Sequence, residues 1–300
     1  MKPLFAVLAM TALPVTAFAE TVSVETATGP QDAPLNPAKV VALDLSAIDT
    51  LDALGVDIAG IPDVTPPAYL AAATEGVPTV GTLFEPDFEA LAVMAPDLVI
   101  AGGRSQPKVQ ALTAVAPTLD MTIDAGKVMA EAKARIDAYG AIFGLSPEAQ
   151  ALTAELGTAL QNAKTAADGK GDALILMTNG GKVSAYGDKS RFGWLHSEVG
   201  LPEAYPDVAD GKHGEAVSFE FIADVDPDWI FVVDRSAAIG QEAEAAAVTL
   251  DNPLVAGTKA GQAGQIVYLD SAPLYLAGGG VQSLTHTLKQ LTTALSASNS

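Results

Sequence analysis

One stretch of sequence occurs twice in this chain of 300 residues, and the second copy begins 131 positions after the first. The copies span 88–104 and 219–235, and Phe, Glu, Ala, Pro, Asp and the closing Arg fall in register without a gap. Each copy predicts a short helix, a Pro-Asp turn and a buried strand, because 98–101 and 229–233 are continuous apolar runs typical of parallel sheets. The repeat therefore predicts two similar α/β lobes.

Each copy ends in an arginine, Arg104 in the first and Arg235 in the second. Ligands of open α/β sheets bind beyond the carboxyl ends of the strands, so we expect both side chains in one crevice between the lobes. A guanidinium group stays protonated and forms paired, charge-assisted hydrogen bonds with anionic oxygens. A single arginine at a strand end is usually a plain surface residue, but two in register predict an anionic ligand.

Residues 1–19 have the pattern of an export signal, with one Lys, an apolar stretch over 4–12 and the small-residue sequence Ala17-Phe18-Ala19. We expect cleavage after Ala19 and a mature protein in the periplasm. No later segment has the run of about 18 apolar residues that spans a bilayer, so no stable membrane insertion is expected. The chain has no cysteine, which leaves no residue for lipoprotein-type acylation or for a disulfide framework.

The remaining residues are enough for two domains. Segment 20–37 is rich in Thr, Pro and Gly without periodicity and predicts a flexible lead-in. We assign an N-terminal α/β lobe to 38–125 and a C-terminal α/β lobe to 146–300. Apolar residues recur at helical spacing in between, so 126–145 is predicted as the inter-lobe helix. The expected fold class is α/β, with two Rossmann-like lobes joined by a single long α-helix.

The chain is strongly acidic, with 36 Asp and Glu against 16 Lys and Arg and a formal net charge of −20. Such a surface repels polyanions, which argues against nucleic acid and anionic membranes as partners. Acidity of this kind often serves solubility alone. In so acidic a chain, however, a cluster of arginines is stronger evidence for a binding site than it would be in a basic one.

Three further residues are candidates for a ligand site. Arg191 lies in the motif Ser190-Arg191-Phe192-Gly193, ahead of a helical stretch. His213 is the best metal-ligand candidate among three histidines because it lies in a glycine-flanked loop, although a lone histidine is more often structural. A phenolate such as that of Tyr275 is a hard ligand suited to ferric iron, and a bound cation lowers the phenol pKa. The alternative for Tyr275 is a core aromatic with its hydroxyl at the surface.

Several enzyme motifs are missing from the sequence. There is no Gly-x-Ser-x-Gly elbow, no Walker A loop, no His-Glu-x-x-His pair and no Gly-x-Gly-x-x-Gly behind a strand. The run Gly278-Gly279-Gly280 is by itself a weak signal. A secreted α/β enzyme with His213 as general base stays open as an alternative, but no obvious nucleophile is paired with that histidine.

A set of short motifs, spread in order over nearly the whole chain, resembles the periplasmic ferric-siderophore-binding proteins of ABC importers, specifically the catecholate and petrobactin type. Each motif is modest alone, and their order makes the resemblance fairly specific. The motifs are Val41-Ala42-Leu43-Asp44, Gly81-Thr82-Leu83-Phe84-Glu85-Pro86, Gly102-Gly103-Arg104, Ser190-Arg191-Phe192-Gly193, Lys212-His213-Gly214, Val232-Val233-Asp234-Arg235, Asp251-Asn252-Pro253-Leu254-Val255 and Tyr275-Leu276.

The resemblance implies a class III periplasmic binding protein with two α/β lobes, one long connecting helix and limited hinge motion. It implies that Arg104, Arg191 and Arg235 contact catecholate oxygens of the iron complex. It also implies that His213 and Tyr275 complete the coordination of the iron when the siderophore supplies only four donors. No cofactor is bound permanently, because the ferric siderophore is the transported ligand.

The resemblance further implies an ABC transporter permease as the partner. In this family a Glu at the start of each repeated helix docks on arginines of the permease, and Glu89 and Glu220 match these positions. Stabilisation of the helix N-terminus is the alternative role. We expect a monomer that performs no covalent chemistry. Haem or a corrinoid is the alternative ligand within the same fold, because one Tyr or His could serve as an axial ligand.

Overall fold

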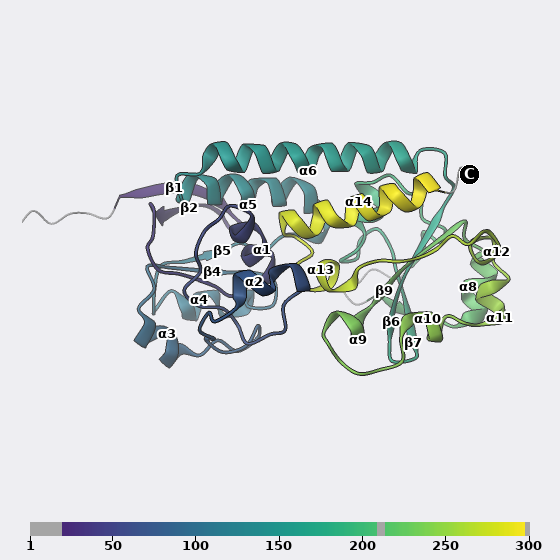
Figure 1. The fold of residues 1–300 in the computed structure, drawn as a ribbon, viewed down its shortest axis with the longest axis horizontal. Helices are drawn as coiled ribbons and strands as arrows, with labels where there is room; N and C mark the ends of the chain where they lie inside the picture. The colour runs from purple at the N-terminus through teal and green to yellow at the C-terminus, as the bar shows by residue number, and fades with distance from the viewer. Residues whose placement is uncertain (1–19, 209–213, 298–300) are drawn as a thin grey trace, which may run out of the picture.

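A computed structural model describes residues 20–208 and 214–297 of the chain. The molecule is elongated, with a three-stranded sheet towards one end, a five-stranded sheet towards the other and long helices along one side (Figure 1). The predicted export signal 1–19 and His213 lie outside the described residues. Within the described ranges, no helix is both long and apolar enough to cross a membrane.

The three-stranded sheet is parallel and has the strand order β3-β4-β5. Every residue of its strands β3 (Val40–Ala42), β4 (Leu98–Ala101) and β5 (Thr118–Asp120) is buried, which explains the unbroken apolar run in the first repeat copy. The helical elements of this part of the chain are α1 (Leu45–Ala53), η1 (Ala68–Leu70), α2 (Ala71–Thr74), α3 (Phe88–Met94), η2 (Gln106–Lys108), α4 (Val109–Leu112) and η3 (Ala125–Lys127).

The five-stranded sheet is mixed and has the strand order β10-β9-β6-β7-β8. Strand β6 pairs in parallel with β9 and antiparallel with β7, with which it forms a hairpin that turns at Gly180-Gly181. The strands are β6 (Ala173–Asn179), β7 (Lys182–Tyr186), β8 (Glu215–Ala216), β9 (Trp229–Asp234) and β10 (Ile266–Tyr268). The helices are α7 (Trp194–Ser197), α8 (Phe219–Val225), α9 (Arg235–Ala238), α10 (Ala246–Thr249), α11 (Pro253–Ala256), α12 (Lys259–Ala263), α13 (Ser271–Leu276) and α14 (Val281–Ala297).

The helix, turn and strand predicted for each repeat copy are confirmed. Helices α3 and α8 are both seven residues long, and each ends in a left-handed non-glycine residue, Ala95 at φ 47° and Asp226 at φ 48°. The Asp of each Pro-Asp turn then binds the segment that enters the neighbouring strand. Asp97 accepts hydrogen bonds from the backbone N–H groups before β3, and Asp228 accepts one from the residue before β6. The two copies therefore use the same local structure.

The predicted flexible lead-in over 20–37 is wrong, because this segment forms an antiparallel hairpin. Strand β1 (Thr21–Thr26) pairs with β2 (Gly29–Pro34), and the turn uses Gly29 at φ 98°. The alternation in 21–26 places Val24 in the core, and Ala33 of the partner strand is fully buried. A period-two pattern of β-branched residues thus outweighed the Thr, Pro and Gly content from which disorder was inferred.

Three long helices lie along one side of the molecule. Helix α5 (Val128–Ile142) packs on β1 and on α6 (Ser146–Ala167), and α14 packs on both α6 and α1. In Figure 1, α6 extends over both sheets, whereas α5 lies beside the N-terminal one. Apart from the lead-in, the predicted domain bounds, with 126–145 as the inter-lobe helix, stay a prediction.

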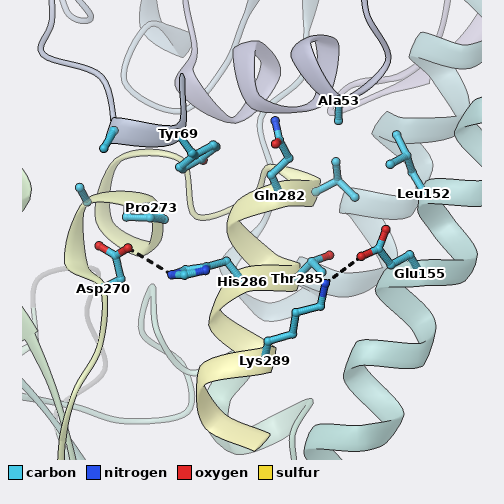
Figure 2. Close-up of a pocket in the computed structure, with 13 residues that line it drawn as sticks. Ala53, Tyr69, Leu152, Glu155, Asp270, Pro273, Gln282, Thr285, His286 and Lys289 are labelled. Carbon is cyan, nitrogen blue, oxygen red and sulfur yellow. Dashed lines mark hydrogen bonds and ion pairs between the residues drawn. The ribbon is translucent and has the colours of Figure 1, made fainter. Parts of the chain in front are cut away.

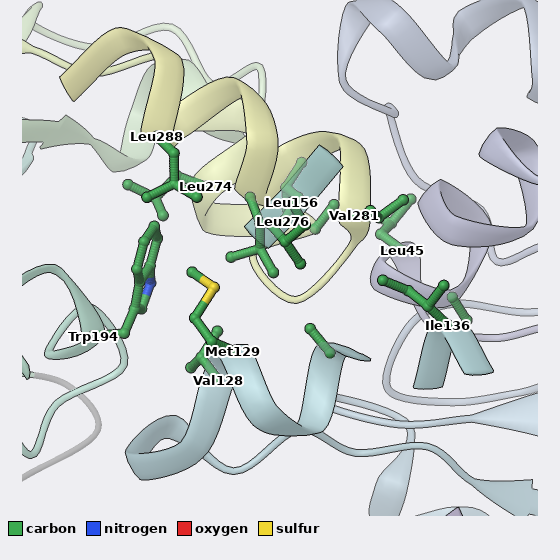
Figure 3. Close-up of a cluster of buried hydrophobic side chains, with 14 of the residues drawn as sticks. Leu45, Val128, Met129, Ile136, Leu156, Trp194, Leu274, Leu276, Val281 and Leu288 are labelled. Carbon is green, nitrogen blue, oxygen red and sulfur yellow. The ribbon is translucent and has the colours of Figure 1, made fainter. Parts of the chain in front are cut away.

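One continuous apolar cluster joins elements of both halves of the chain. It includes Leu45 of α1, Ile136 of α5 and Leu156 of α6, which are at most 1% exposed. From the C-terminal half it takes Trp194, Leu274 and further side chains of α13 and α14 (Figure 3). Because close-packed interiors resist sliding, this shared core restricts movement of one sheet relative to the other.

Candidate functional site

The structure brings three of the predicted arginines to Tyr275, which lies in α13. Arg104 follows β4, Arg191 lies between β7 and α7, and Arg235 is the first residue of α9. The Nη2 atoms of Arg104 and Arg191 donate to the backbone carbonyl oxygen of Tyr275 at 3.1 and 2.6 Å. Arg235 Nε donates to the phenol oxygen of Tyr275 at 3.2 Å. One tyrosine therefore accepts hydrogen bonds from three cations.

The same arginines lie against the aromatic ring of Tyr275. Their guanidinium carbons are 5.3 Å from the ring centroid for Arg104, 4.2 Å for Arg191 and 6.0 Å for Arg235. Cations within about 6 Å of a ring centroid are attracted by the electrons of the ring face. Hydrogen bonds and ring contacts together hold the cluster around Tyr275.

The electrostatics of the cluster favour the phenolate form of Tyr275. Burial opposes ionisation, but the hydrogen bond from Arg235 and the positive charges of Arg191, Arg235 and Arg104 outweigh it and hold the pKa of Tyr275 below its usual value. The pKa of Arg191 is lowered by burial and by the like charge of Arg104. An anion between these side chains would relieve that repulsion.

Three residues of this site were missed by the sequence analysis. Asn179, at the end of β6, accepts a hydrogen bond from Arg235 Nη1 at 3.1 Å. The ring of Phe192 lies 5.0 Å from the guanidinium carbon of Arg191 and 4.9 Å from the ring of Tyr186. Asn179 is the last residue of β6, which neighbours β9, so the rule that sites form at adjacent strand ends could have found it.

The predicted iron ligand His213 is outside the described residues, and its role stays a prediction. The next residue, Gly214, lies against Tyr186, since a Cβ atom at Gly214 would be 2.6 Å from that ring. Burial raises the pKa of Tyr186 to about 12, and the charges of Arg191 and Tyr275 also act on it. Within 20–208 and 214–297, no group of three or more His, Cys, Asp and Glu side chains could hold a metal ion.

The sequence model of the periplasmic binding protein family matches residues 40–273. The chain belongs to this family. It is 36% identical to the petrobactin-binding protein YclQ of Bacillus subtilis over 262 residues, which cover 86% of this chain and 82% of YclQ. It is 30% identical to the ferric-anguibactin-binding protein FatB of Vibrio anguillarum over 255 residues, which cover 83% of this chain and 79% of FatB.

Solved structures agree with this assignment. The crystal structure of YclQ matches with a TM-score of 0.87 and 34% identity, over 92% of this chain and 99% of that one. The periplasmic catecholate-siderophore-binding protein VctP of Vibrio cholerae matches with a TM-score of 0.85 and 28% identity, over 93% of this chain and 100% of that one. The predicted fold class, an α/β class III periplasmic binding protein, is confirmed.

The two glutamates of this binding protein that were predicted to dock on a permease are both exposed, each in the first turn of its helix. Glu89 lies in α3, which is capped by Asp87, and Glu220 lies in α8, which is capped by Ser218. The backbone N–H of Glu220 and the hydroxyl of Ser218 lower the pKa of the Glu220 carboxyl. In Figure 1, α3 and α8 lie far apart, towards opposite ends of the molecule.

A cavity of about 690 Å³ lies elsewhere, between η1, α6, α13 and α14 (Figure 2). Neither Tyr275 nor any of the three arginines lines it. The polar groups of its wall already have partners, because a hydrogen bond joins His286 to Asp270 at 3.1 Å and an ion pair joins Lys289 to Glu155 at 2.9 Å. We place the candidate ligand site at the arginines instead, because three cations converge there on one tyrosine.

Proposed function

We propose that this periplasmic binding protein captures a ferric siderophore of the catecholate type and delivers it to an ABC permease of the inner membrane. The observation that carries the proposal is the convergence of Arg104, Arg191 and Arg235 on the phenol and carbonyl of Tyr275. Relatives named for petrobactin, anguibactin and catecholate siderophores support the ligand class.

Ligand oxygens would replace internal acceptors at this site. Arg104 and Arg191 both donate to the carbonyl of Tyr275, which carries only a partial negative charge. Catecholate oxygens of a ferric complex carry more charge, and hydrogen bonds to charged acceptors are roughly twice as strong as those to neutral ones. The bound complex thus gains from two arginines that are already directed at one point.

Tyr275 supplies an oxygen ligand for the iron of a complex with only four siderophore donors. Its lowered pKa makes the phenolate easier to form, and Fe³⁺ prefers such hard anionic oxygens. His213 is proposed as the second protein ligand. Both residues follow α6 in the chain, so the direct contacts to iron come from one lobe.

The protein acts by binding, without covalent chemistry. The two described histidines already have other partners: His196 is buried with Nδ1 2.9 Å from the carbonyl of Leu201, and His286 pairs with Asp270. Export with cleavage after Ala19 and a monomeric state complete the proposal. Glu89 and Glu220 are the proposed contacts with the permease, one on each lobe.

The test is a titration of the purified protein with the ferric complex of a bis-catechol ligand. We expect quenching of the intrinsic fluorescence with a Kd of about 1 μM or below, as a scavenging receptor requires. On binding, the wild type should develop a charge-transfer band from iron coordinated by the Tyr275 phenolate. Tyr275→Phe should not develop this band. No response at tens of micromolar, together with a stoichiometric Soret shift on addition of haem, would establish haem as the ligand instead.

The affinity should also depend on pH in a defined direction. Coordination through Tyr275 requires the ionised phenol, so binding releases a proton while the pH is below the pKa of Tyr275. Affinity should therefore rise with pH up to that lowered pKa and level off above it. Tyr275→Phe should remove this rise, and an identical pH profile in the two proteins would show that the phenol does not bind iron.

A further inference from the structure

The first backbone N–H groups of helix α14 are not capped by a side chain close in sequence. Side chains of α1 accept their hydrogen bonds instead. Asp49 accepts from Gln282 N at 2.8 Å and from Ser283 N at 3.0 Å. Thr50 Oγ1 lies 3.3 Å from Val281 N. The first N–H groups of a helix have no partner within the helix, and a carboxylate near them is favoured by the helix dipole. Here the capping carboxylate is 233 positions away in the sequence.

Asp49 is the centre of this contact. Its side chain is fully buried, and the hydroxyl of Tyr69 donates to it as well. The amide of Gln282 reaches back to α1, where it donates to the carbonyl of Asp49 at 2.9 Å and to Asp52 at 2.7 Å. The contacts of Gln282 and Ser283 join α1, before the first repeat copy, to the start of the C-terminal helix, and the contact of Tyr69 joins η1 to α1.

The run Gly278-Gly279-Gly280 allows this close approach. A Cβ atom at Gly280 would lie 2.3 Å from Asp49 Cγ, and one at Gly279 would lie 2.5 Å from a methyl group of Ile123. Distances under 3 Å are not tolerated without a shift of the neighbouring atoms. A side chain at 280 would therefore displace Asp49, whereas one at 279 would displace only the end of the Ile123 side chain.

The same segment is held at its other end by Arg104, which donates to the carbonyls of Tyr275 and Leu276 at 3.1 and 3.4 Å. Tyr275 thus lies three residues before a glycine run that is fixed to α1. A displacement of this run would move the phenol and the carbonyl on which the three arginines converge.

We propose that Asp49 is a positioning residue for the ligand site, which fixes Tyr275 among the arginines by capping α14 from α1. The consequence for siderophore affinity rests on the function proposed above, whereas the position of Tyr275 does not. The hydrogen bonds of the Asp49 side chain go to Tyr69, Gln282 and Ser283 and not to the arginines. Asp49 acts through the glycine run, as outer residues of metal sites act through the ligands they orient.

The burial of the Asp49 carboxyl group supports its role as a positioning residue. Burial raises the pKa of Asp49 to about 7, although the Tyr69 hydroxyl and the N–H groups of Gln282 and Ser283 lower it. Burial of a carboxyl group at this depth costs desolvation free energy, which these hydrogen bonds offset. Groups of this kind are concentrated at functional sites.

The test measures the ionisation of Tyr275 by ultraviolet difference absorbance, with Tyr275→Phe to assign its signal. We expect Asp49→Asn to shift the titration of Tyr275 upward, towards that of an ordinary tyrosine. The matched control is Asp87→Asn, which removes a carboxylate that caps α3 through two N–H groups at 3.0 Å, away from the site. An unshifted titration in a folded Asp49→Asn protein would overturn the proposal.

Gly280→Ala provides a second and independent variant, because the added methyl group would push against Asp49. Its control is Gly157→Ala in α6, where a Cβ atom meets nothing within 4 Å. Gly280→Ala should shift the Tyr275 titration in the same direction as Asp49→Asn, and Gly157→Ala should leave it unchanged. A Gly280→Ala protein that titrates like the wild type would also overturn the proposal.

A third measurement connects the position of Tyr275 to ligand binding. Both site variants should bind the ferric bis-catechol complex roughly tenfold more weakly than the wild type, as is usual when an outer residue of a metal site is lost. Shifted Tyr275 titrations with no binding even to the wild type would leave the role of Asp49 standing and refute the siderophore function. Unshifted Tyr275 titrations in both variants, together with strong binding to the wild type, would refute the role of Asp49 and leave the siderophore function standing.

Discussion

The two copies of the repeated unit share a helix, a turn and a strand, but they use their closing arginines differently. Arg235 follows β9 directly, begins α9 and binds the phenol of Tyr275 and Asn179 within its own half of the chain. Arg104 comes after Gly102-Gly103 and reaches across to the carbonyls of Tyr275 and Leu276. Gly102 and Gly103 stand where the second copy has Val233 and Asp234, and with them the first arginine reaches the other half of the chain instead of staying within its own.

The loop before Arg104 is also built differently from the end of β9. Gly103 has φ 53°, and a Cβ atom at Gly102 would lie 3.0 Å from the buried carboxylate of Asp44. Burial raises the pKa of Asp44 to about 6, and the charge of Arg104 lowers it in turn. The repeat therefore conserves the scaffold that delivers the side chains, while the residues after the strand determine which atom each arginine meets.

The largest expected effects come from substituting the two arginines, which should differ in their effect on Tyr275. Arg104→Gln and Arg235→Gln should each weaken binding of the ferric bis-catechol complex by roughly 10- to 100-fold, because a hydrogen bond to a charged group contributes about 1.5–3 kcal/mol. Only Arg235 donates to the phenol, so Arg235→Gln should raise the pKa of Tyr275 more than Arg104→Gln does. Calorimetry and ultraviolet titration measure the two effects, and equal shifts of the tyrosine would break the comparison.

The two Pro-Asp turns should contribute similarly to stability. Asp97→Ala removes the acceptor of the Ala38 and Lys39 N–H groups, and Asp228→Ala removes that of the Asp172 N–H group. We expect each substitution to lower the free energy of unfolding by about 1.5 kcal/mol in a urea titration. If one of the two proteins were as stable as the wild type, the turns would not be equivalent.

The exposed glutamates test the proposed partner surface in both lobes. Glu89→Arg and Glu220→Arg should each reduce uptake of the ferric siderophore by about tenfold in cells that depend on it for iron, since like charges repel at an interface. Affinity for the ligand should stay unchanged. Glu148→Arg, an exposed acidic residue in the first turn of α6, is the matched control. Uptake that falls equally in the control would show a general effect of charge.

The smallest effect concerns the left-handed residues that end α3 and α8. Ala95→Gly should stabilise the protein by about 0.5–1 kcal/mol, because only glycine adopts this conformation without strain. Asp226→Gly should be nearly neutral, since Asp226 Oδ1 accepts a hydrogen bond from Lys259 N at 2.7 Å that glycine loses. Thermal unfolding of the two variants distinguishes these outcomes, and a destabilised Ala95→Gly protein would contradict the first.

The repeated sequence predicted both strand ends and both arginines because helix, turn and strand are encoded locally in each copy. Arg191 was predicted from its own motif and from the family resemblance, because that motif has no counterpart in the repeat. The contacts of Asp49 could not be predicted, because they join segments 233 positions apart and depend on how whole helices pack. The run Gly278-Gly279-Gly280 was visible in the sequence, but only the partner segment explains why it is glycine.

Three positive charges surround one tyrosine in a chain whose net charge is −20. A catechol without iron keeps its protons and brings no charge to these side chains, whereas chelation of Fe³⁺ drives the protons off and leaves an anion. For a ferric catecholate ligand, the mutual repulsion of the empty arginine cluster is therefore also a means of selection. A ferric complex would relieve this repulsion and an iron-free catechol would not, so we expect the ferric form to bind more tightly.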